Sequence, residues 1–304
     1  MTILKLYRRA LVPVLGLGLA FLFVPGQSLA APGVGNVEIT PDHVAAGSTN
    51  TFKLTFTADT GPLQGQTLID IPRGWSLPQG ARPGATGYVV LARGTCSSAI
   101  KLVRVSGYRL TIATDCKRGQ HFDLTYGPAV ASTLSADGYV FLTQTKPNVG
   151  LTATKLVKVK KVVRNKKTGK RVVKTISKRI AYVVKPTFRP LAQKKQPIVV
   201  VNGGPVDHLA LNAPTIATAG TPFSITVRAE DVYGNTASGY TSTVGFSSSD
   251  PNAFLPPAYQ FTTNDFGAKT LSGLILRAPG AQTITVADNA GHVDVSNPIT
   301  VYSF

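Results

Sequence analysis

The chain has few of the residues that most enzymes use: 4 His, 2 Cys and 14 acidic residues among 304. The histidines are His43, His121, His208 and His292, and no metal-ligand spacing relates them. There is no Gly-x-Ser-x-Gly motif. The acidic residues lie mostly in predicted turns and offer no pair suited to glycoside hydrolysis. We therefore predict that the protein is not an enzyme and has no cofactor or metal site.

Acidic residues are also scarce relative to basic ones, 14 against 32, and the imbalance is local. Residues 155–195 contain 16 Lys and Arg and no Asp or Glu. Outside this segment and three basic residues near the N-terminus, 13 basic residues face 14 acidic ones, so the rest of the chain is nearly neutral. Such a concentration of positive charge favours a polyanionic partner, most strongly at low salt.

Long hydrophobic runs are absent after residue 31. Before it, three basic residues precede an apolar run over 11–24 and the small-x-small pattern Ser28-Leu29-Ala30. This order is typical of a secretory signal peptide, which we predict over 1–31. A retained membrane anchor is the less favoured alternative, because a spanning helix needs roughly 20 apolar residues. We expect a mature chain with no transmembrane segment, either secreted (extracellular) or held at the cell surface.

The two cysteines fit an exported protein. An even pair in an oxidising compartment usually forms a disulfide, so we predict a bond between Cys96 and Cys116. The loop that it closes is worth about 3 kcal/mol by the chain-entropy estimate. The alternative, a cysteine-dependent enzyme, has little support because neither cysteine is accompanied by a His-bearing motif.

Helical periodicity is absent as well, since no window has a sustained amphipathic apolar stripe. Short runs rich in Val, Ile, Thr, Phe and Tyr are separated by turn residues, and the chain has 29 Gly and 21 Pro. Residues 34–149 and 205–304 each hold about seven such runs, as in an immunoglobulin-like sandwich. We predict an all-β protein with two immunoglobulin-like β-sandwich domains, each long enough to bury a core.

The predicted strands of the first block are 37–41, 51–57, 67–72, 88–92, 100–105, 108–114, 122–126 and 139–144. Those of the second block are 208–212, 223–229, 241–247, 259–262, 269–276, 282–287 and 299–302. Trp75 is the single tryptophan. We expect it to pack in the first core, and the alternative is an exposed platform that stacks on sugars.

The second block resembles a known family. Its motifs, in order, are Ala217-Thr-Ala-Gly-Thr-Pro-Phe-Ser-Ile-Thr-Val227, Ala229-Glu-Asp-Val-Tyr-Gly-Asn235, Gly239-Tyr-Thr-Ser-Thr-Val244 and Tyr259-Gln-Phe-Thr262. Over 206–303 they are similar to the bacterial immunoglobulin-like repeats of secreted and surface proteins, including many adhesins. The resemblance implies a sandwich fold and roles in spacing, display and adhesion. The first block resembles a related bacterial surface domain more loosely, through Ala46-Gly-Ser-Thr49 and Pro72-Arg-Gly-Trp75.

Sandwich loops sometimes bind calcium through carboxylates and carbonyls. The residues that would do so here are Asp231, Asn235, Asp250 and Asp265. The interpretation that we favour is that Asp231 and Asn235 hydrogen-bond the backbone of their own turn.

The basic segment is predicted to be folded. Val and Ile are interleaved with its charges, and β-branched residues favour strands. Runs over 155–164 and 170–176 flank the turn Asn165-Lys-Lys-Thr-Gly169, so we predict a β-hairpin followed by a third extended run over 179–185. Ordering only on binding and a plain linker are the alternatives. Prolines then predict an extended connector, and 150–204 is assigned as basic hairpin and Pro-containing linker.

We predict that the cations of the hairpin bind polyanions. These residues are Lys158, Lys160, Lys161, Arg164, Lys166, Lys167, Lys170, Arg171, Lys174, Lys178 and Arg179. An exported protein would meet an anionic polysaccharide or wall polymer. Sequence-specific nucleic-acid binding is not expected, because few aromatic residues accompany the cations.

Three functional hypotheses follow from these observations. The first is a surface-binding or adhesion protein that contacts anionic envelope or matrix polymers through its cationic segment. The second is a structural spacer or assembly subunit whose hairpin docks on a protein partner at the surface. The third, a hydrolase or accessory enzyme module, has no catalytic motif to support it.

Overall fold

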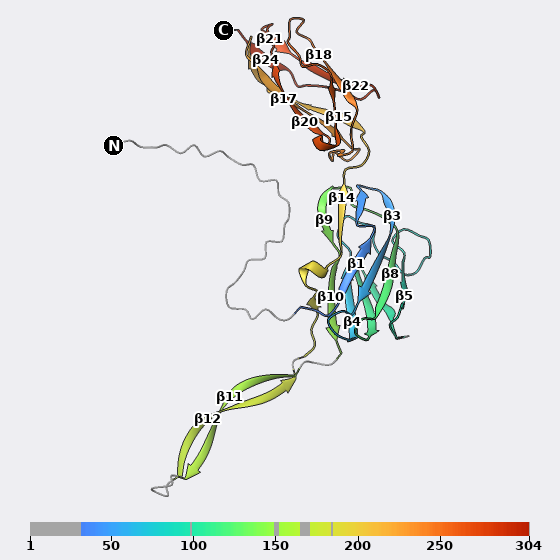
Figure 1. Ribbon diagram of the computed structural model, residues 1–304, viewed down its shortest axis with the longest axis vertical. Helices are drawn as coiled ribbons and strands as arrows, with labels where there is room; N and C mark the ends of the chain where they lie inside the picture. The colour runs from blue at the N-terminus through green and yellow to red at the C-terminus, as the bar shows by residue number, and fades with distance from the viewer. Residues whose placement is uncertain (1–31, 98, 149–151, 165–170, 184, 304) are drawn as a thin grey trace, which may run out of the picture. The chain divides into compact units, whose positions relative to one another are not determined.

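The computed structural model describes residues 32–97, 99–148, 152–164, 171–183 and 185–303. The predicted signal peptide over 1–31 and the predicted hairpin turn over 165–169 lie outside these residues. The regular secondary structure of the described chain is β-strand, as predicted, apart from two short 3-10 helices (Figure 1). Within it, no helix is long and apolar enough to cross a membrane.

The first sandwich has two antiparallel sheets around one hydrophobic core. One sheet has the order β1-β3-β8-β5, with β1 Asn36–Thr40, β3 Thr49–Thr57, β8 His121–Val130 and β5 Val89–Ala92. The other has the order β13-β10-β4-β7-β6, with β13 Arg189–Pro190, β10 Leu142–Pro147, β4 Leu63–Asp70, β7 Arg109–Cys116 and β6 Lys101–Ser106.

The core of the first sandwich follows from alternation along its strands. Phe52, Leu54 and Phe56 of β3 are at most 1% exposed, because alternate residues of a strand point to the same face. Trp75 is buried and its ring centroid lies 5.1 Å from that of Phe52 and 5.2 Å from that of Phe141. The expected core role of Trp75 is therefore confirmed.

A third sheet completes the first sandwich, and its central strand comes from residues that we had assigned to the linker. Its order is β2-β14-β9, with β2 His43–Ala45, β14 Ile198–Asn202 and β9 Ala136–Val140. Strand β14 runs parallel to β2 and antiparallel to β9, and Val199 and Val201 are buried in the first core. Together with β13, this strand places 189–202 in the first sandwich rather than in a connector.

The second sandwich has three small sheets around its own core. The first is β15-β17-β20, with β15 His208–Asn212, β17 Phe223–Glu230 and β20 Ala268–Leu274. The second is β16-β24-β21, with β16 Ile216–Thr218, β24 Ile299–Tyr302 and β21 Gly280–Gln282. The third is β19-β18-β22-β23, with β19 Tyr259–Gln260, β18 Thr243–Ser248, β22 Ile284–Asp288 and β23 Val293–Val295.

Both sandwiches contain the same short parallel contact between an early and a late strand. In the first, β2 pairs with β14, and in the second, β16 pairs with β24. This correspondence identifies β14 as the closing strand of the first sandwich. The connection to β15 is then only the stretch from Gly203 to Asp207.

The basic segment forms a separate two-stranded sheet of β11 Thr152–Arg164 and β12 Arg171–Val183. The two strands are antiparallel over 13 residue pairs, from Thr152 opposite Val183 to Arg164 opposite Arg171. The predicted hairpin is thus present. The separate third run over 179–185 was wrong, because residues 179–183 continue β12 without a break. No Gly or Pro interrupts the sequence between Arg171 and Val183.

Candidate functional site

The hairpin β11–β12, which we call the ribbon, is an insertion in the first sandwich. It leaves after β10, which ends at Pro147, and returns at β13, which begins at Arg189. These flanking strands pair with each other, Thr145 opposite Arg189. Both ends of the insertion are therefore tied to neighbouring strands, although the sequence suggested a tether between domains.

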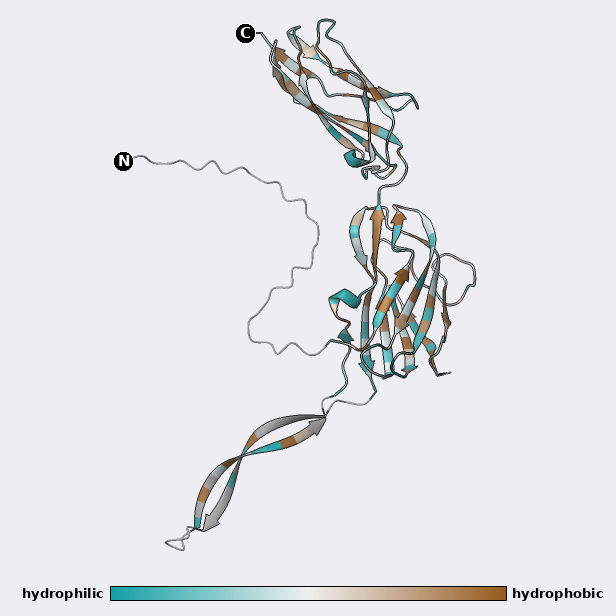
Figure 2. Ribbon diagram, in the orientation of Figure 1, coloured by the Kyte–Doolittle hydropathy of each residue, from teal (hydrophilic) through white to brown (hydrophobic). Residues whose placement is uncertain are grey.

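The register of the ribbon sorts its described side chains onto two faces, because directly opposed residues share a face. Val157 lies opposite Lys178, and Ile176 and Ile180 flank Lys178 at alternate positions of β12. The other face carries polar and basic residues together with a valine and an alanine; these are Lys158, Lys160, Arg171, Val173, Thr175, Ser177, Arg179 and Ala181. Figure 2 shows hydrophobic and hydrophilic positions following one another along the ribbon.

Five of the eleven predicted polyanion-binding residues have exposed, described side chains. They are Lys158, Lys160, Arg171, Lys178 and Arg179. Three more, Lys161, Arg164 and Lys174, lie in the strands, with side chains outside the description. Lys166, Lys167 and Lys170 fall outside the described residues altogether. The structure therefore brings five of the predicted cations onto one exposed element.

The C-terminal end of the basic segment has a different role. Lys195, at the end of the 3-10 helix Gln193–Lys195, forms an ion pair with Asp59 of the first sandwich. Phe188 accepts a cation–π contact from Lys146, whose Nζ lies 5.1 Å from the ring centroid. These contacts attach the returning chain to the sandwich, although Lys185 and Lys194 outside the ribbon are also exposed.

Asp231, one of the residues weighed for calcium, is fully engaged by the protein itself. It is 1% exposed and accepts hydrogen bonds from the N–H groups of Gly204, Tyr233 and Asn235, at 2.7, 2.9 and 2.9 Å. Burial acts to raise the pKa of Asp231, and these hydrogen bonds outweigh it and lower the pKa. The favoured interpretation, that Asp231 bonds the backbone of its own turn, is confirmed.

Asn235, in the same turn, also hydrogen-bonds the backbone of residues outside the turn. Its Nδ2 donates to both carboxylate oxygens of Asp231, and to the carbonyl of Thr133 at 2.8 Å. Its Oδ1 accepts from the N–H of Ser135 at 2.9 Å. Nothing in the local sequence indicated the bonds to Thr133 and Ser135.

The other two carboxylates weighed for calcium are also engaged. Asp250 is 3% exposed and accepts from the N–H groups of Asn252, Arg277 and Ala278. Asp265 closes a capping box with Thr262 and forms an ion pair with Lys269 at 2.9 Å. The described residues contain no group of three His, Cys, Asp or Glu that is arranged to hold a metal ion.

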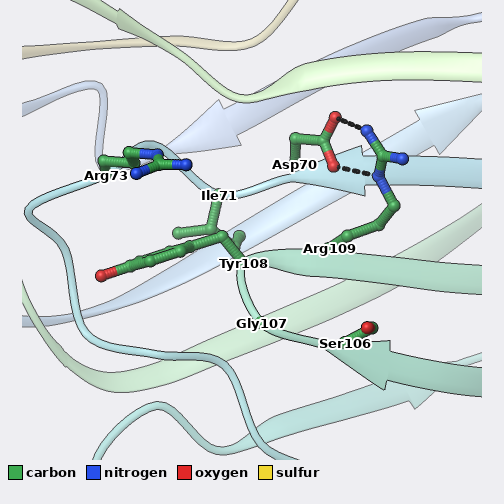
Figure 3. A pocket seen from close by; sticks show the side chains of 7 residues that line it. All are labelled: Asp70, Ile71, Arg73, Ser106, Gly107, Tyr108 and Arg109. Carbon is green, nitrogen blue, oxygen red and sulfur yellow. Dashed lines mark hydrogen bonds and ion pairs between the residues drawn. The ribbon is translucent and has the colours of Figure 1, made fainter.

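An open pocket of about 570 Å³ lies where β4 ends and β6 turns into β7 (Figure 3). Two residues that line it, Asp70 and Arg109, form a bidentate ion pair with N–O distances of 2.6 and 2.8 Å. The hydrogen bond to Asp70 raises the pKa of Arg109. The charges of Asp70 and Arg109 therefore satisfy each other in this pocket.

The predicted disulfide is present, with Cys96 and Cys116 bonded at an S–S distance of 2.01 Å. The sulfurs are buried, the residues being 6% and 1% exposed. The bond joins the loop before β6 to the last residue of β7, so it secures the edge of the five-stranded sheet.

Comparison with known proteins adds the following. No family model matches the chain, and no curated protein matches it. The structure is similar to the adhesin FdeC of Escherichia coli, with 15% identity and a TM-score of 0.25 over 90% of this chain and 98% of that chain. It is also similar to the type II cohesin dyad from the adaptor ScaA scaffoldin of Acetivibrio cellulolyticus, with 9% identity and a TM-score of 0.26 over 89% of this chain and 97% of that chain. A third similar structure is the ICAM-5 D1-D4 ectodomain fragment, with 11% identity and a TM-score of 0.21 over 89% of this chain and 77% of that chain. At these scores the likenesses carry no functional argument, and the site must be interpreted from its own residues.

Proposed function

We propose that the protein is a non-catalytic surface-binding protein, secreted or held at the cell surface, whose ribbon contacts anionic polymers of the envelope or matrix. The observation that supports this proposal is the exposure of five cations on one element, in a segment that contains no acidic residue. Closely set cations without counter-charges create a strong positive potential. An anionic polysaccharide or wall polymer, with charges repeated along its length, would fit the extended strands.

Salt provides the first test of this proposal. Between about 0.1 M and about 1 M salt, the Debye length falls from about 10 Å to about 3 Å. Retention of the protein on a heparin column should therefore be strong at the lower salt and lost at the higher. Equal retention at both salt concentrations would show that the ribbon does not bind through charge.

Charge removal tests whether the ribbon is the binding element. A variant in which Lys158, Lys160, Arg171, Lys178 and Arg179 become Gln should elute from heparin at a clearly lower salt concentration than the unaltered protein, because five of the twelve cations of the ribbon are removed. A matched control changes five exposed cations of the first sandwich to Gln; these are Arg73, Arg82, Arg93, Lys101 and Arg104. The control should retain binding. If the two variants weaken retention equally, the ribbon has no special role and the proposal fails.

A structural spacer or assembly subunit is the second function that a specific observation favours. Strands β11 and β12 pair with each other, so each presents an unpaired edge along its described length. Such edges can add a strand from another protein. Light scattering at several protein and salt concentrations distinguishes assembly from polymer binding. A protein that stays monomeric and binds polyanions in a salt-sensitive way argues against assembly through the ribbon.

A further inference from the structure

The face of the ribbon around Lys178 has more apolar surface than polymer binding requires. Ile176 is 43% exposed and Ile180 is 40% exposed, although both are large aliphatic residues. Val157 shares this face and is half-buried. By backbone register, Val159 lies opposite Ile176 and Lys155 opposite Ile180. The face thus combines aliphatic side chains with at least one cation, Lys178.

In the described part of the chain, no third strand extends the sheet of β11 and β12. A two-stranded sheet is only marginally stable in water by itself. A partner that covers the aliphatic side chains would therefore stabilise the ribbon as well as bind it.

Charge decides which partner fits. A second copy of the chain would bring two acid-free ribbons together, each with 12 Lys and Arg between Thr152 and Val183, and like charges repel. A soluble polyanion would neutralise the cations and leave Ile176 and Ile180 in water. An anionic bilayer interface accepts apolar side chains among the headgroups and pairs its phosphates with cations.

We propose that the ribbon binds the interface of an anionic lipid bilayer, with Val157, Ile176 and Ile180 toward the lipid. This inference rests on the cations of the proposed function and goes beyond polymer binding. The ribbon lies in the headgroup region, because open sheet edges have unpaired N–H and C=O groups that the hydrocarbon cannot satisfy. The cations on the outer face reach the same phosphates, since paired strands are only about 5 Å apart and Lys and Arg side chains are long.

Vesicle binding tests the inference. The protein is mixed with vesicles of equal parts phosphatidylglycerol and phosphatidylcholine, or of phosphatidylcholine alone, and the bound fraction is measured by sedimentation. We expect binding to the anionic vesicles and little to the neutral ones. The double variant Ile176→Ser/Ile180→Ser, whose charge is unchanged, should bind the anionic vesicles at least about tenfold more weakly. Its retention on heparin should be unchanged.

A matched control replaces two exposed valines of the second sandwich, in Val293→Ser/Val295→Ser, and should bind vesicles like the unaltered protein. The fluorescence of buried Trp75 reports whether each variant is folded. The variant Ile180→Trp adds a measure of depth: brominated lipid should quench the introduced indole, while Trp75 in the core is unaffected. An unquenched indole would place this face away from the lipid and overturn the inference.

The outcomes separate the two proposals. Heparin retention without vesicle binding, or vesicle binding that the two serines leave unchanged, overturns the lipid inference and leaves the polymer proposal standing. Vesicle binding that the serines weaken, without heparin retention, supports the lipid inference and removes the polymer proposal. Binding to neither overturns both.

Discussion

Buried carboxylates hold the turns of the second sandwich by accepting backbone N–H groups. Asp231, Asp250 and Asp288 are all buried or have buried side chains, and hydrogen bonds lower the pKa of each against the raising effect of burial. The Asp288 carboxylate accepts from the hydroxyl of Tyr240 and the ring of His292, both at 2.8 Å. An anion is stable in such a site only because several donors surround it.

The Asp231 turn gives a test with a definite pH dependence. Asp231→Asn should lower the free energy of unfolding by about 2 kcal/mol at neutral pH, because a hydrogen bond to a charged group is worth about 1.5–3 kcal/mol. Since the folded pKa is lowered, this stabilisation is present above the unfolded pKa of about 3.9 and is lost as pH falls through the folded value. Urea unfolding should therefore show a smaller difference between protein and variant at about pH 3 than at neutral pH.

Asp207→Asn is the control for this experiment, because Asp207 is exposed and should change the stability by less than about 0.5 kcal/mol. An equal effect of Asp231→Asn at both pH values would mean that the carboxylate acts through its shape and not through its charge.

The disulfide gives a second test at the residue scale. Replacing both Cys96 and Cys116 by Ala should reduce the free energy of unfolding of the first sandwich by about 3 kcal/mol, the loop-closure estimate for a separation of 20 residues. The midpoint of urea unfolding, followed by the emission of Trp75, measures the effect. An unchanged midpoint would mean that the cross-link adds no stability.

At the residue scale, single-residue chemistry was easier to predict than long-range contact. The Cys96–Cys116 bond and the Asp231 turn followed from residue type and spacing. The bonds of Asn235 to Thr133 and Ser135 did not, because their sequence separations are 102 and 100 residues. When one side chain hydrogen-bonds both its own turn and a backbone about 100 residues away, the sequence indicates only the bond within the turn.

Strand β14 is the element that sequence patterns misplaced, and the reason is physical. Its partner β2 lies far upstream and runs parallel to it, and such pairing leaves no local turn signal. Flanking prolines also resemble a connector. Most of the longer strands were predicted to within a few residues, and His208–Asn212 and Ile299–Tyr302 match β15 and β24 fully. The short strands β2, β13, β16, β21 and β23 were not predicted. Local alternation therefore revealed the longer strands of each sandwich but not the short strands and β14.

The placement of β14 can be tested directly. Val199 is fully buried, whereas its neighbour Ile198 is 41% exposed. Val199→Ala should lower the free energy of unfolding of the first sandwich by about 2 kcal/mol, because it leaves a cavity in the core. Ile198→Ala should cost less than about 1 kcal/mol. Equal small effects in thermal or urea unfolding would show that 198–202 is a connector after all.

On the scale of the whole molecule, charge is distributed unevenly between the two sandwiches and the ribbon. Residues 34–149 contain 10 basic and 7 acidic residues, and 205–304 contain 3 and 7. Many of these acids take part in ion pairs or backbone bonds within their own sandwich, such as Asp70, Asp123 and Asp265. The ribbon has no acid of its own, so its charge remains available to an external partner.

The same cations should also keep copies of the molecule apart. Each ribbon strand is 13 residues long with an unpaired edge, and it contains β-branched residues that favour pairing. Charged side chains on such edges prevent uncontrolled strand addition. We therefore expect the five-Gln ribbon variant to self-associate in light scattering at about 0.1 M salt, where the unaltered protein stays monomeric.

Reversing the charge separates this protective role from ligand binding. A variant with Glu at Lys158, Lys160, Arg171, Lys178 and Arg179 should bind polyanions more weakly still than the Gln variant, because it also introduces negative charge. It should self-associate more than the Gln variant, because seven other Lys and Arg remain between Lys155 and Lys174, so that five Glu lower the net charge of the ribbon from about +7 to about +2 and let opposite charges pair between copies. Weaker self-association of the Glu variant than of the Gln variant would contradict a protective role of net charge. Self-association of the unaltered protein, growing as salt screens its cations, would instead favour the ribbon as an assembly edge.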